Sequence, residues 1–430
     1  MKRELKIAII MAVLFFAAFI FLVKYTENIN NSNIINNKAD VYQGYSMEQT
    51  ISYQKSKVNL WLCSTGVSFV VPLLFIASGF SAALRQRLQQ NYKSAFLVIV
   101  LFFAIYSLVS YIISLPLEYY GGYVLKHSYG LSNQELFKWL NDSFKGFMIN
   151  TAMGAAAVWG LYMLIRRVPH SWWLYAGLLS IPVLFFLTFV TPVYIDPLFN
   201  KYVTMKNPPL EASIRQELKT AGVSDCQVYM VDKSVDTKEM NAYMTGVFST
   251  KRIVLWDTTV NSLTSREVLS VTAHEIGHYV LGHIWKAIIL GGALTIIILF
   301  LANKGTIWVL ANSGGAFGVN TIKDIASLPL IILLLNLLLF AAAPGINAYT
   351  RYTEREADRF ELELTRDNEA AITSTLKLHQ GSLIISTPGI IYKLWNYDHP
   401  TFQERIDFAA SYSPWKFGQP LKYEKYFRNR

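Results

Sequence analysis

The feature that most constrains the fold of this chain is a series of seven apolar segments, each long enough to cross a lipid bilayer. They cover residues 7–23, 60–82, 95–115, 147–165, 172–194, 287–302 and 328–343. An α-helix needs about 20 apolar residues to span the hydrocarbon core, and only helices and closed barrels satisfy their backbone hydrogen bonds there. The pattern predicts a predominantly α-helical polytopic membrane protein with about seven transmembrane helices. The sixth segment, which Gly291-Gly292 interrupts, is the weakest of the series.

The composition supports a membrane protein rather than two or three soluble domains. Of the 430 residues, 53% are hydrophobic and only 16% are charged, as expected for a chain that crosses a bilayer several times. The net charge of +10 would also fit a nucleic-acid-binding protein, but no dense basic cluster accompanies it. We therefore predict no nucleic-acid partner and assign the basic excess to loops that orient a membrane protein. Cys63 and Cys226 lack C-x-x-C spacing, so neither a disulfide scaffold nor a thiolate metal site is expected.

The predicted location is a cell membrane, crossed several times, with the lipid bilayer as a partner. Lys24-Tyr25, rather than small residues, follows the first apolar segment, so a retained anchor is favoured over a cleaved signal peptide. Basic residues beside the segments favour a cytoplasmic N-terminus; they are Lys2, Arg3, Arg85, Arg87, Lys93, Arg166 and Arg167. Five crossings would then place the following region outside the cytoplasm. Lysines in the opposite loops make this bias small, so the side of the membrane stays open.

The apolar segments divide the chain into four predicted parts. Residues 1–195 form a five-transmembrane N-terminal region, and residues 286–349 hold two further transmembrane helices. Residues 196–285 form a soluble region with short strands, and residues 350–430 form a C-terminal helical region. The soluble parts are therefore expected to gather at a membrane boundary as a small α+β unit.

Periodicity within the soluble parts predicts their elements. In the first, an amphipathic helix is expected at 210–221 and short strands at 227–231, 242–248 and 252–256. Thr264 and Glu267 form a capping box, which predicts a helix from there to about residue 281. A charged helix at 351–365 should continue from the seventh apolar segment, with Pro344-Gly345 bending the junction.

The predicted helix at 265–281 carries two histidines four residues apart, with a glutamate directly after the first: His274-Glu275-Ile276-Gly277-His278. Residues i and i+4 share one helical face, so His274 and His278 are able to offer imidazole nitrogens to one ion. Glu275 is placed to take a proton from water at that ion rather than to bind it. This is the H-E-x-x-H zinc-hydrolase signature. The alternative, two histidines that only cap or pack, would bury imidazoles without strong partners among apolar neighbours.

Two histidines leave a catalytic zinc site incomplete, because such sites take three protein ligands. Leu281 and Ile284 stand where a metzincin would have its glycine and third histidine, so that class is excluded. His283 points away from the ligand face, and we interpret it as lying behind a ligand or at an interface. Glu354 and Asp358, four residues apart on the charged helix, remain: one carboxylate would bind the metal and the other an imidazole N–H. An exposed ion-paired helix face is the alternative, and Glu356 fits it.

The motifs together resemble the membrane-embedded zinc metalloproteases typified by type I CAAX prenyl endopeptidase, with the heat-shock protease HtpX more distantly similar. Besides the H-E-x-x-H motif and Glu354-x-x-x-Asp358, four other elements carry the likeness. They are residues 115–117 through 130–134 before the fourth membrane segment, residues 194–201 after the fifth, residues 241–246 with 251–255, and His399-Pro400 with Glu404-Arg405. The insertion that eukaryotic members carry before H-E-x-x-H is absent, which indicates a compact bacterial-type member. Tyr352-Thr353 depart from the eukaryotic pattern, which puts the transfer of a substrate preference in doubt.

The resemblance implies a single zinc ion per chain, bound by His274, His278 and Glu354, with Asp358 holding a ligand imidazole. It implies that Glu275 activates water, that His399 and Arg405 stabilise the oxyanion, and that Asn241, Ala242 and Tyr243 pair with a peptide or membrane-protein substrate. The expected activity is cleavage of peptide bonds in the manner of a CAAX prenyl protease. In the eukaryotic relatives the catalytic region lies in the cytosol.

Two alternatives stay open at this point. A general quality-control protease for membrane proteins would need no prenyl group. A catalytically silent zinc-binding scaffold would have no use for Glu275, and a transporter would carry more ionisable residues within its segments.

Overall fold

The computed structural model describes residues 2–37 and 46–428. Within these residues, seven helices are long and apolar enough to cross a membrane, which confirms the predicted count. Six of them are α1 (Arg3–Asn37), α2 (Met47–Ala77), α6 (Leu136–Arg167), α7 (Trp172–Val190), α11 (His283–Ser313) and α12 (Leu328–Thr365). The remaining one is α4 (Ala95–Tyr119), which continues through a π-helical turn, η1 (Tyr120–Val124), into α5 (Leu125–Ser128).

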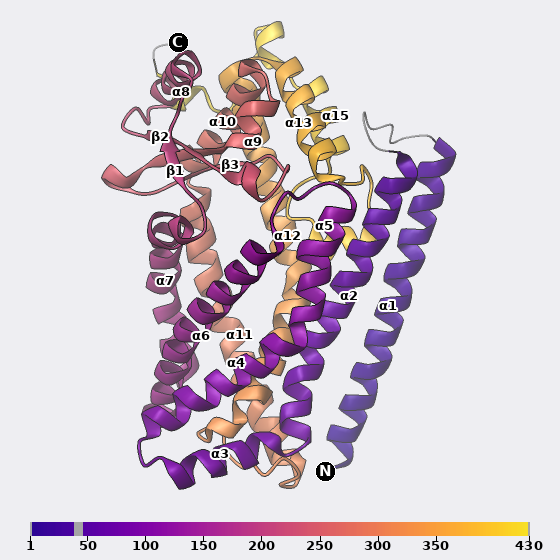
Figure 1. Cartoon of the computed structure of the whole chain (residues 1–430), viewed down its shortest axis with the longest axis vertical. Coiled ribbons are helices and arrows are strands. Elements are labelled where there is room, and N and C mark those ends of the chain that lie inside the picture. The colour runs from indigo at the N-terminus through magenta and orange to yellow at the C-terminus, as the bar shows by residue number, and fades with distance from the viewer. Residues whose placement is uncertain (1, 38–45, 429–430) are drawn as a thin grey trace.

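The helices extend beyond the predicted apolar segments at most ends. One predicted boundary is wrong: the second apolar segment does not continue as a helix to residue 82. Helix α2 stops at Ala77, and α3 (Phe80–Asn91) starts after Gly79. Gly79 adopts φ 75°, a left-handed conformation that glycine adopts without strain. The short helix α3 lies across the end of the bundle, as Figure 1 shows.

The interruption expected in the sixth segment does not occur, because α11 runs unbroken through Gly291-Gly292. Tight packing against α7 explains the small residue there. A Cβ at Gly292 would lie 2.3 Å from Ile181 Cγ1, and one at Gly177 of α7 would lie 2.4 Å from Ile296 Cγ1. Small residues at such crossings let membrane helices approach closely.

Helix α12 is the longest element and belongs to both the membrane and the soluble part. Its first half packs among the membrane helices, and its second half continues past Pro344 without a break in the helix. Phe360 of this second half is fully buried, in one core cluster with Ile276 and Val268. One helix therefore connects the membrane region to the soluble core.

The soluble part contains a four-stranded sheet of order β1-β2-β4-β3. Strands β2 (Gln227–Val231) and β4 (Arg252–Trp256) have the predicted bounds and pair in parallel. Strand β3 (Ala242–Thr245) is shorter than predicted, because Gly246 at φ 94° turns the chain into the 3₁₀ turn η5 (Phe248–Thr250). Strand β1 (Tyr202–Thr204), of three residues, is too short for an alternating pattern to reveal.

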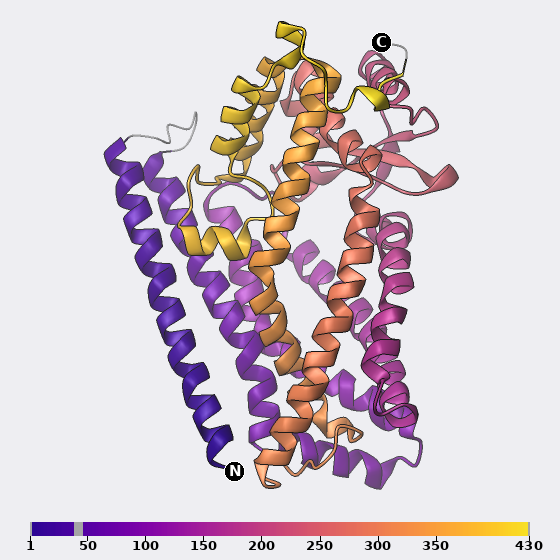
Figure 2. The same ribbon diagram turned by 180° about the vertical axis from the view of Figure 1, so that it is seen from behind.

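Helices cover the sheet and complete the soluble part. Helix α8 (Pro208–Thr220) buries Leu210, Ile214 and Leu218 in the same cluster as the sheet. Helix α10 (Ser265–Val280) begins at the predicted capping box, where Thr264 and Glu267 bond reciprocally. The C-terminal helices α13 (Asn368–Ser382), α14 (Ile390–Asn396) and α15 (Phe402–Ser411) follow α12. Figures 1 and 2 show this part at the end of the molecule opposite the N-terminus.

The loop before α6 binds the segment that leads into β3. Ser132 forms a β-bridge with Thr237, and the Lys238 amide donates to the Leu131 carbonyl at 3.0 Å. Lys138 of α6 pairs with Asp236 at 2.5 Å. We call residues 129–135 the clamp loop, since these contacts join the membrane helices to the edge of the sheet.

Helices α10 and α12 cross closely because position 277 is glycine. A Cβ there would lie only 3.0 Å from Phe360 Cβ. We expect Gly277→Val to force the helices apart and to cost about 1–3 kcal/mol of stability, as overpacking of a core does. Thermal unfolding in detergent would measure the loss. Gly345→Ala on α12 is the matched control, because no atom lies within 4 Å of its added methyl, and equal melting of the two variants would contradict the prediction.

Candidate metal centre

Three side chains from two helices converge at the crossing of α10 and α12. His274 and His278 project from one face of α10, and their Nε2 atoms lie 3.1 Å apart. Glu354 of α12 faces both: Oε2 lies 3.1 Å from His274 Nε2, and Oε1 lies 3.3 Å from His278 Nε2. His274 and Glu354 are buried, and His278 is partly buried. The predicted residues are therefore brought together from positions far apart in the sequence.

The spacing of these atoms fits a tetrahedral metal ion. Ligand atoms about 2.0–2.1 Å from zinc at tetrahedral angles are separated by roughly 3.3 Å, close to the 3.1–3.3 Å observed here. Two imidazole nitrogens that face each other and a carboxylate need a shared positive charge between them. The donor set, two nitrogens and one carboxylate, is that of His-His-Glu zinc sites.

A charged pair behind His274 holds its ring. Nδ1 of His274 lies 3.2 Å from Asp358 Oδ1, which directs the opposite nitrogen, Nε2, at the centre. Arg405 of α15 in turn donates through Nε at 3.0 Å and Nη2 at 2.7 Å to the same Asp358 oxygen. Asp358 and Arg405 are thus brought to the site, with Arg405 compensating a buried carboxylate.

His278 is supported differently. Its Nδ1 lies 3.0 Å from Nδ1 of His283, the first residue of α11. One of these nitrogens donates to the other, so both histidines of the motif have a partner for the nitrogen that faces away from the centre. His283 lies behind a motif histidine, as its place in the sequence indicated, and does not reach the centre.

Glu275 lies beside the centre without belonging to the triangle. It lines a cavity of about 100 Å³ together with His274, His399 and Arg405. Burial raises the pKa of the Glu275 carboxyl above its ordinary value, while His274 and His278 oppose that shift. A carboxyl group in this position is able to exchange a proton with a molecule in the cavity.

His399 enters the cavity from the loop between α14 and α15. Its Nε2 lies 3.3 Å from Glu354 Oε2, and its Nδ1 lies 2.8 Å from Asp398 Oδ1. Burial by itself lowers the pKa of this imidazole, but Asp398 and Glu354 outweigh it, and the pKa is raised. The side chain remains 51% exposed, so it is accessible to a molecule that enters.

The edge of the sheet forms one wall of the cavity. Asn241 and Ala242, at the start of β3, line it with His274 and Glu275, and β3 is an outer strand of the sheet in the described chain. Tyr243 points elsewhere, and its hydroxyl lies 2.9 Å from the Tyr202 hydroxyl. Of the three residues predicted to meet a substrate, Asn241 and Ala242 line the cavity and Tyr243 does not.

Sequence reasoning missed two residues of this region. Glu361 lies 3.7 Å from His274 Nδ1 and accepts a hydrogen bond from Ser270 of α10. Its position seven residues after Glu354, on the same helical face, was a usable signal. Asp398 precedes His399 directly, but nothing in the sequence indicated that the loop would fold its carboxylate back onto the ring.

Comparisons with known proteins agree with this architecture. The model of peptidase family M48 matches residues 204–413, and the model of the CAAX prenyl protease N-terminal region, with five membrane helices, matches residues 27–201. An uncharacterized metalloprotease of Bacillus subtilis, YhfN, is 35% identical over 84% of this chain and 85% of its own. CAAX prenyl protease 1 of Saccharomyces cerevisiae is 28% identical, over 71% of this chain and 70% of its own.

A solved structure shows the same fold. The crystal structure of Ste24p from S. mikatae superposes with a TM-score of 0.80, at 23% sequence identity, over 93% of this chain and 97% of its own. The similarity therefore covers the membrane helices as well as the soluble part.

Glu354 and Glu356 have different partners. Glu354 faces the two histidines, whereas the Glu356 carboxylate is bound by Lys422 and Arg359. We expect Glu354→Ala to lower the zinc retained after dialysis by at least about tenfold, because even the loss of a residue that only supports a ligand lowers metal affinity by roughly 10–100-fold. Glu356→Gln, the matched control, should retain the wild-type amount. Zinc per chain is measured by plasma mass spectrometry on detergent-purified protein. Equal zinc in the Glu354 variant and the wild type would refute the third ligand.

Proposed function

The chain belongs to peptidase family M48 as a membrane metalloprotease of the CAAX prenyl protease family, and from this premise we propose that it is a zinc-dependent endopeptidase whose general base is Glu275. The observation that carries the proposal is the triangle of His274, His278 and Glu354, with Glu275 beside it on a shared cavity. We assign one zinc ion per chain to that triangle. When bound, zinc supplies Lewis acidity, which acidifies water and polarises a peptide carbonyl.

Glu275 moves the proton in this scheme. Its carboxylate accepts a proton from the water that attacks the carbonyl carbon, and the carbon–oxygen bond forms. As the carbon–nitrogen bond breaks, Glu275 returns that proton to the leaving amine. The partly buried position of Glu275 suits this exchange, because a raised pKa makes the carboxylate a stronger base for the proton that it takes from water.

His399 and Arg405 take different parts. His399 reaches the cavity beside Glu354, where its ring is placed to donate to the oxygen that gains negative charge. Arg405 lines the same cavity but directs Nε and Nη2 at Asp358. We therefore assign oxyanion stabilisation mainly to His399, and to Arg405 the orientation of Asp358 and, through it, of His274.

The substrate backbone would add to β3 as a further strand. An edge strand offers hydrogen-bonding groups that any peptide is able to pair with, so the sequence demand is low. Asn241 and Ala242 at the start of that strand lie on the cavity with Glu275, which places a paired peptide next to the base.

Two substrate classes follow from the relatives. Several relatives are named CAAX prenyl protease 1. On this ground the function that we propose first is cleavage at a prenylated peptide end. YhfN, which has the higher identity of 35%, is named only as a metalloprotease, and this favours the second candidate, a general protease of membrane or unfolded proteins. A zinc-binding scaffold without activity would have no use for Glu275 on the cavity.

Glu275→Gln should keep the zinc and lose the activity. Removing the base should lower kcat by roughly 10²–10⁴-fold, the usual contribution of general acid–base catalysis, while the zinc content stays at the wild-type level because Glu275 is not in the triangle. Cleavage of a quenched fluorescent peptide in detergent measures the rate. Undiminished turnover with full zinc would end the proposal.

A pair of matched peptides distinguishes the two substrate classes. If a prenyl group is recognised, a farnesylated peptide ending in a CAAX sequence should be cleaved with kcat/KM at least about tenfold above that of the same peptide with a free cysteine, a difference of about 1.4 kcal/mol. Equal values for the two peptides would favour the general protease. Glu275→Gln serves as the control for contaminating peptidases in both assays.

A further inference from the structure

A polar stripe runs along the otherwise apolar membrane helix α4. Tyr106, Ser110, Ser114 and Glu118 follow one another at intervals of four residues, so they share one helical face. Polar and ionisable side chains are costly in contact with lipid, and in membrane helices they face the protein interior or water. The stripe therefore marks the side of α4 that faces inward.

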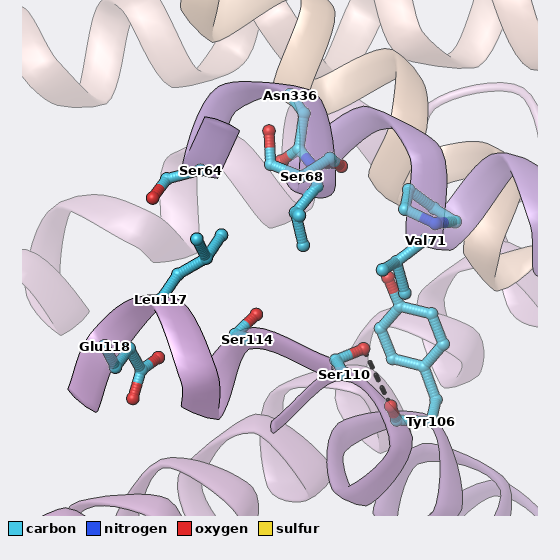
Figure 3. Close-up of a pocket in the computed structure, with 11 residues that line it drawn as sticks. Ser64, Ser68, Val71, Tyr106, Ser110, Ser114, Leu117, Glu118 and Asn336 are labelled. Atoms are coloured by element: carbon cyan, nitrogen blue, oxygen red, sulfur yellow. Dashed lines mark hydrogen bonds between the residues drawn. The ribbon is translucent and has the colours of Figure 1, made fainter. Parts of the chain in front are cut away.

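A cavity of about 200 Å³ lies in front of this stripe. Figure 3 shows Ser64 and Ser68 of α2 and Asn336 of α12 on the wall opposite Ser110, Ser114 and Glu118. Asn336 donates to the Ser68 carbonyl at 2.7 Å, and Ser110 donates to the Tyr106 carbonyl at 2.8 Å. We call this cavity the serine pocket.

Several groups of the serine pocket are unpartnered. Among the described residues, none forms a hydrogen bond or ion pair with the Glu118 carboxylate, and the hydroxyls of Ser64 and Ser114 bond to none either. Unpaired polar groups within a membrane span require water or a bound polar group as a partner. The pocket is therefore hydrated or occupied.

The serine pocket adjoins a second cavity of about 560 Å³ that reaches the clamp loop. The two share Ser64, Leu117 and Glu118, and the second continues to Gln134 and Asp142. The π-helical turn η1 lies on its wall through Gly121 and Gly122; such turns are frequent at functional sites. The second cavity therefore reaches the clamp loop, which binds the segment before β3.

The charge along this path is negative. Of the described residues that line the two cavities, Glu118 and Asp142 carry the charges. Asp142 is neutralised by Lys138 at 3.2 Å and Lys145 at 3.7 Å, whereas no lysine or arginine in the described part of the chain pairs with Glu118. Glu118 thus leaves one uncompensated negative charge, flanked by serine hydroxyls that accept hydrogen bonds.

We propose that the serine pocket binds a cationic side chain, lysine or arginine, of the peptide substrate, with Glu118 as its counter-charge. The proposal rests on the peptidase function proposed above and adds a preference for basic peptides to it. The Glu118 carboxylate is exposed and lines the cavity, and a carboxylate with surrounding hydroxyls binds an ammonium or guanidinium group and rejects an anionic one.

Thiol labelling tests the pocket without any use of the peptidase activity. In a Cys63→Ala background, Ser114→Cys should react with charged, membrane-impermeant methanethiosulfonates, and the cationic reagent should react at least several-fold faster than the anionic one. Adding Glu118→Gln should abolish that preference. Ile112→Cys, on the exposed outer face of α4, is the control and should stay unlabelled in liposomes. An unreactive Ser114→Cys, or a charge preference that survives Glu118→Gln, would overturn the proposal.

Kinetics test the substrate preference. A peptide with one lysine moved through successive positions is compared with the same peptide containing norleucine. At the position that reaches the pocket, Glu118→Gln should raise KM for the lysine peptide about tenfold, with kcat and the norleucine peptide unchanged. Equal effects on both peptides, or none at any position, would overturn the proposal. Absence of cleavage by the wild type would instead refute the proposed function, and the labelling result would still decide the nature of the pocket.

Discussion

The close crossing of α10 and α12 is the contact on which the rest of the structure depends. Gly277 allows α10 to approach Phe360 so closely that a Cβ would lie only 3.0 Å away. At that separation Glu354 reaches both histidines of α10, and Asp358 reaches the back of His274. A small displacement of either helix would separate the nitrogen and oxygen atoms that converge on the centre.

The same helix, α12, also joins the soluble part to the membrane. Asn336 lies on the serine pocket, and Glu354 lies at the centre, so one continuous helix carries residues of both. The clamp loop and Lys138 of α6 make a second connection, to the segment before β3. Two rigid links of this kind fix the sheet edge relative to the membrane helices, which suits a protease whose substrates lie in or near a bilayer.

Buried charge is compensated locally throughout the site. Asp358 is held by Arg405, Glu356 by Lys422, and Glu267 by Lys377. Each carboxylate would be costly to bury alone. The triangle of His274, His278 and Glu354 is supported by such pairs, but no lysine or arginine among the described residues lies at its centre or pairs with Glu118. A positive partner from outside the chain would compensate the charge at both places.

The sequence by itself determined the seven membrane helices, the capping box of α10, the bounds of β2 and β4, and the face that His274 shares with His278. Each follows from a local pattern: apolar length, a reciprocal cap, alternation, or a spacing of four residues. Local patterns did not reveal β1, the early end of β3 at Gly246, or the unbroken path of α11 through Gly291-Gly292, because packing against distant segments decides these. Tertiary structure alone brought Glu361 and Asp398 to the site, turned Tyr243 towards Tyr202, and placed the stripe from Tyr106 to Glu118 on the wall of a cavity. The physical reason is that sequence spacing specifies which residues share a face, whereas only the packed helices specify what that face meets.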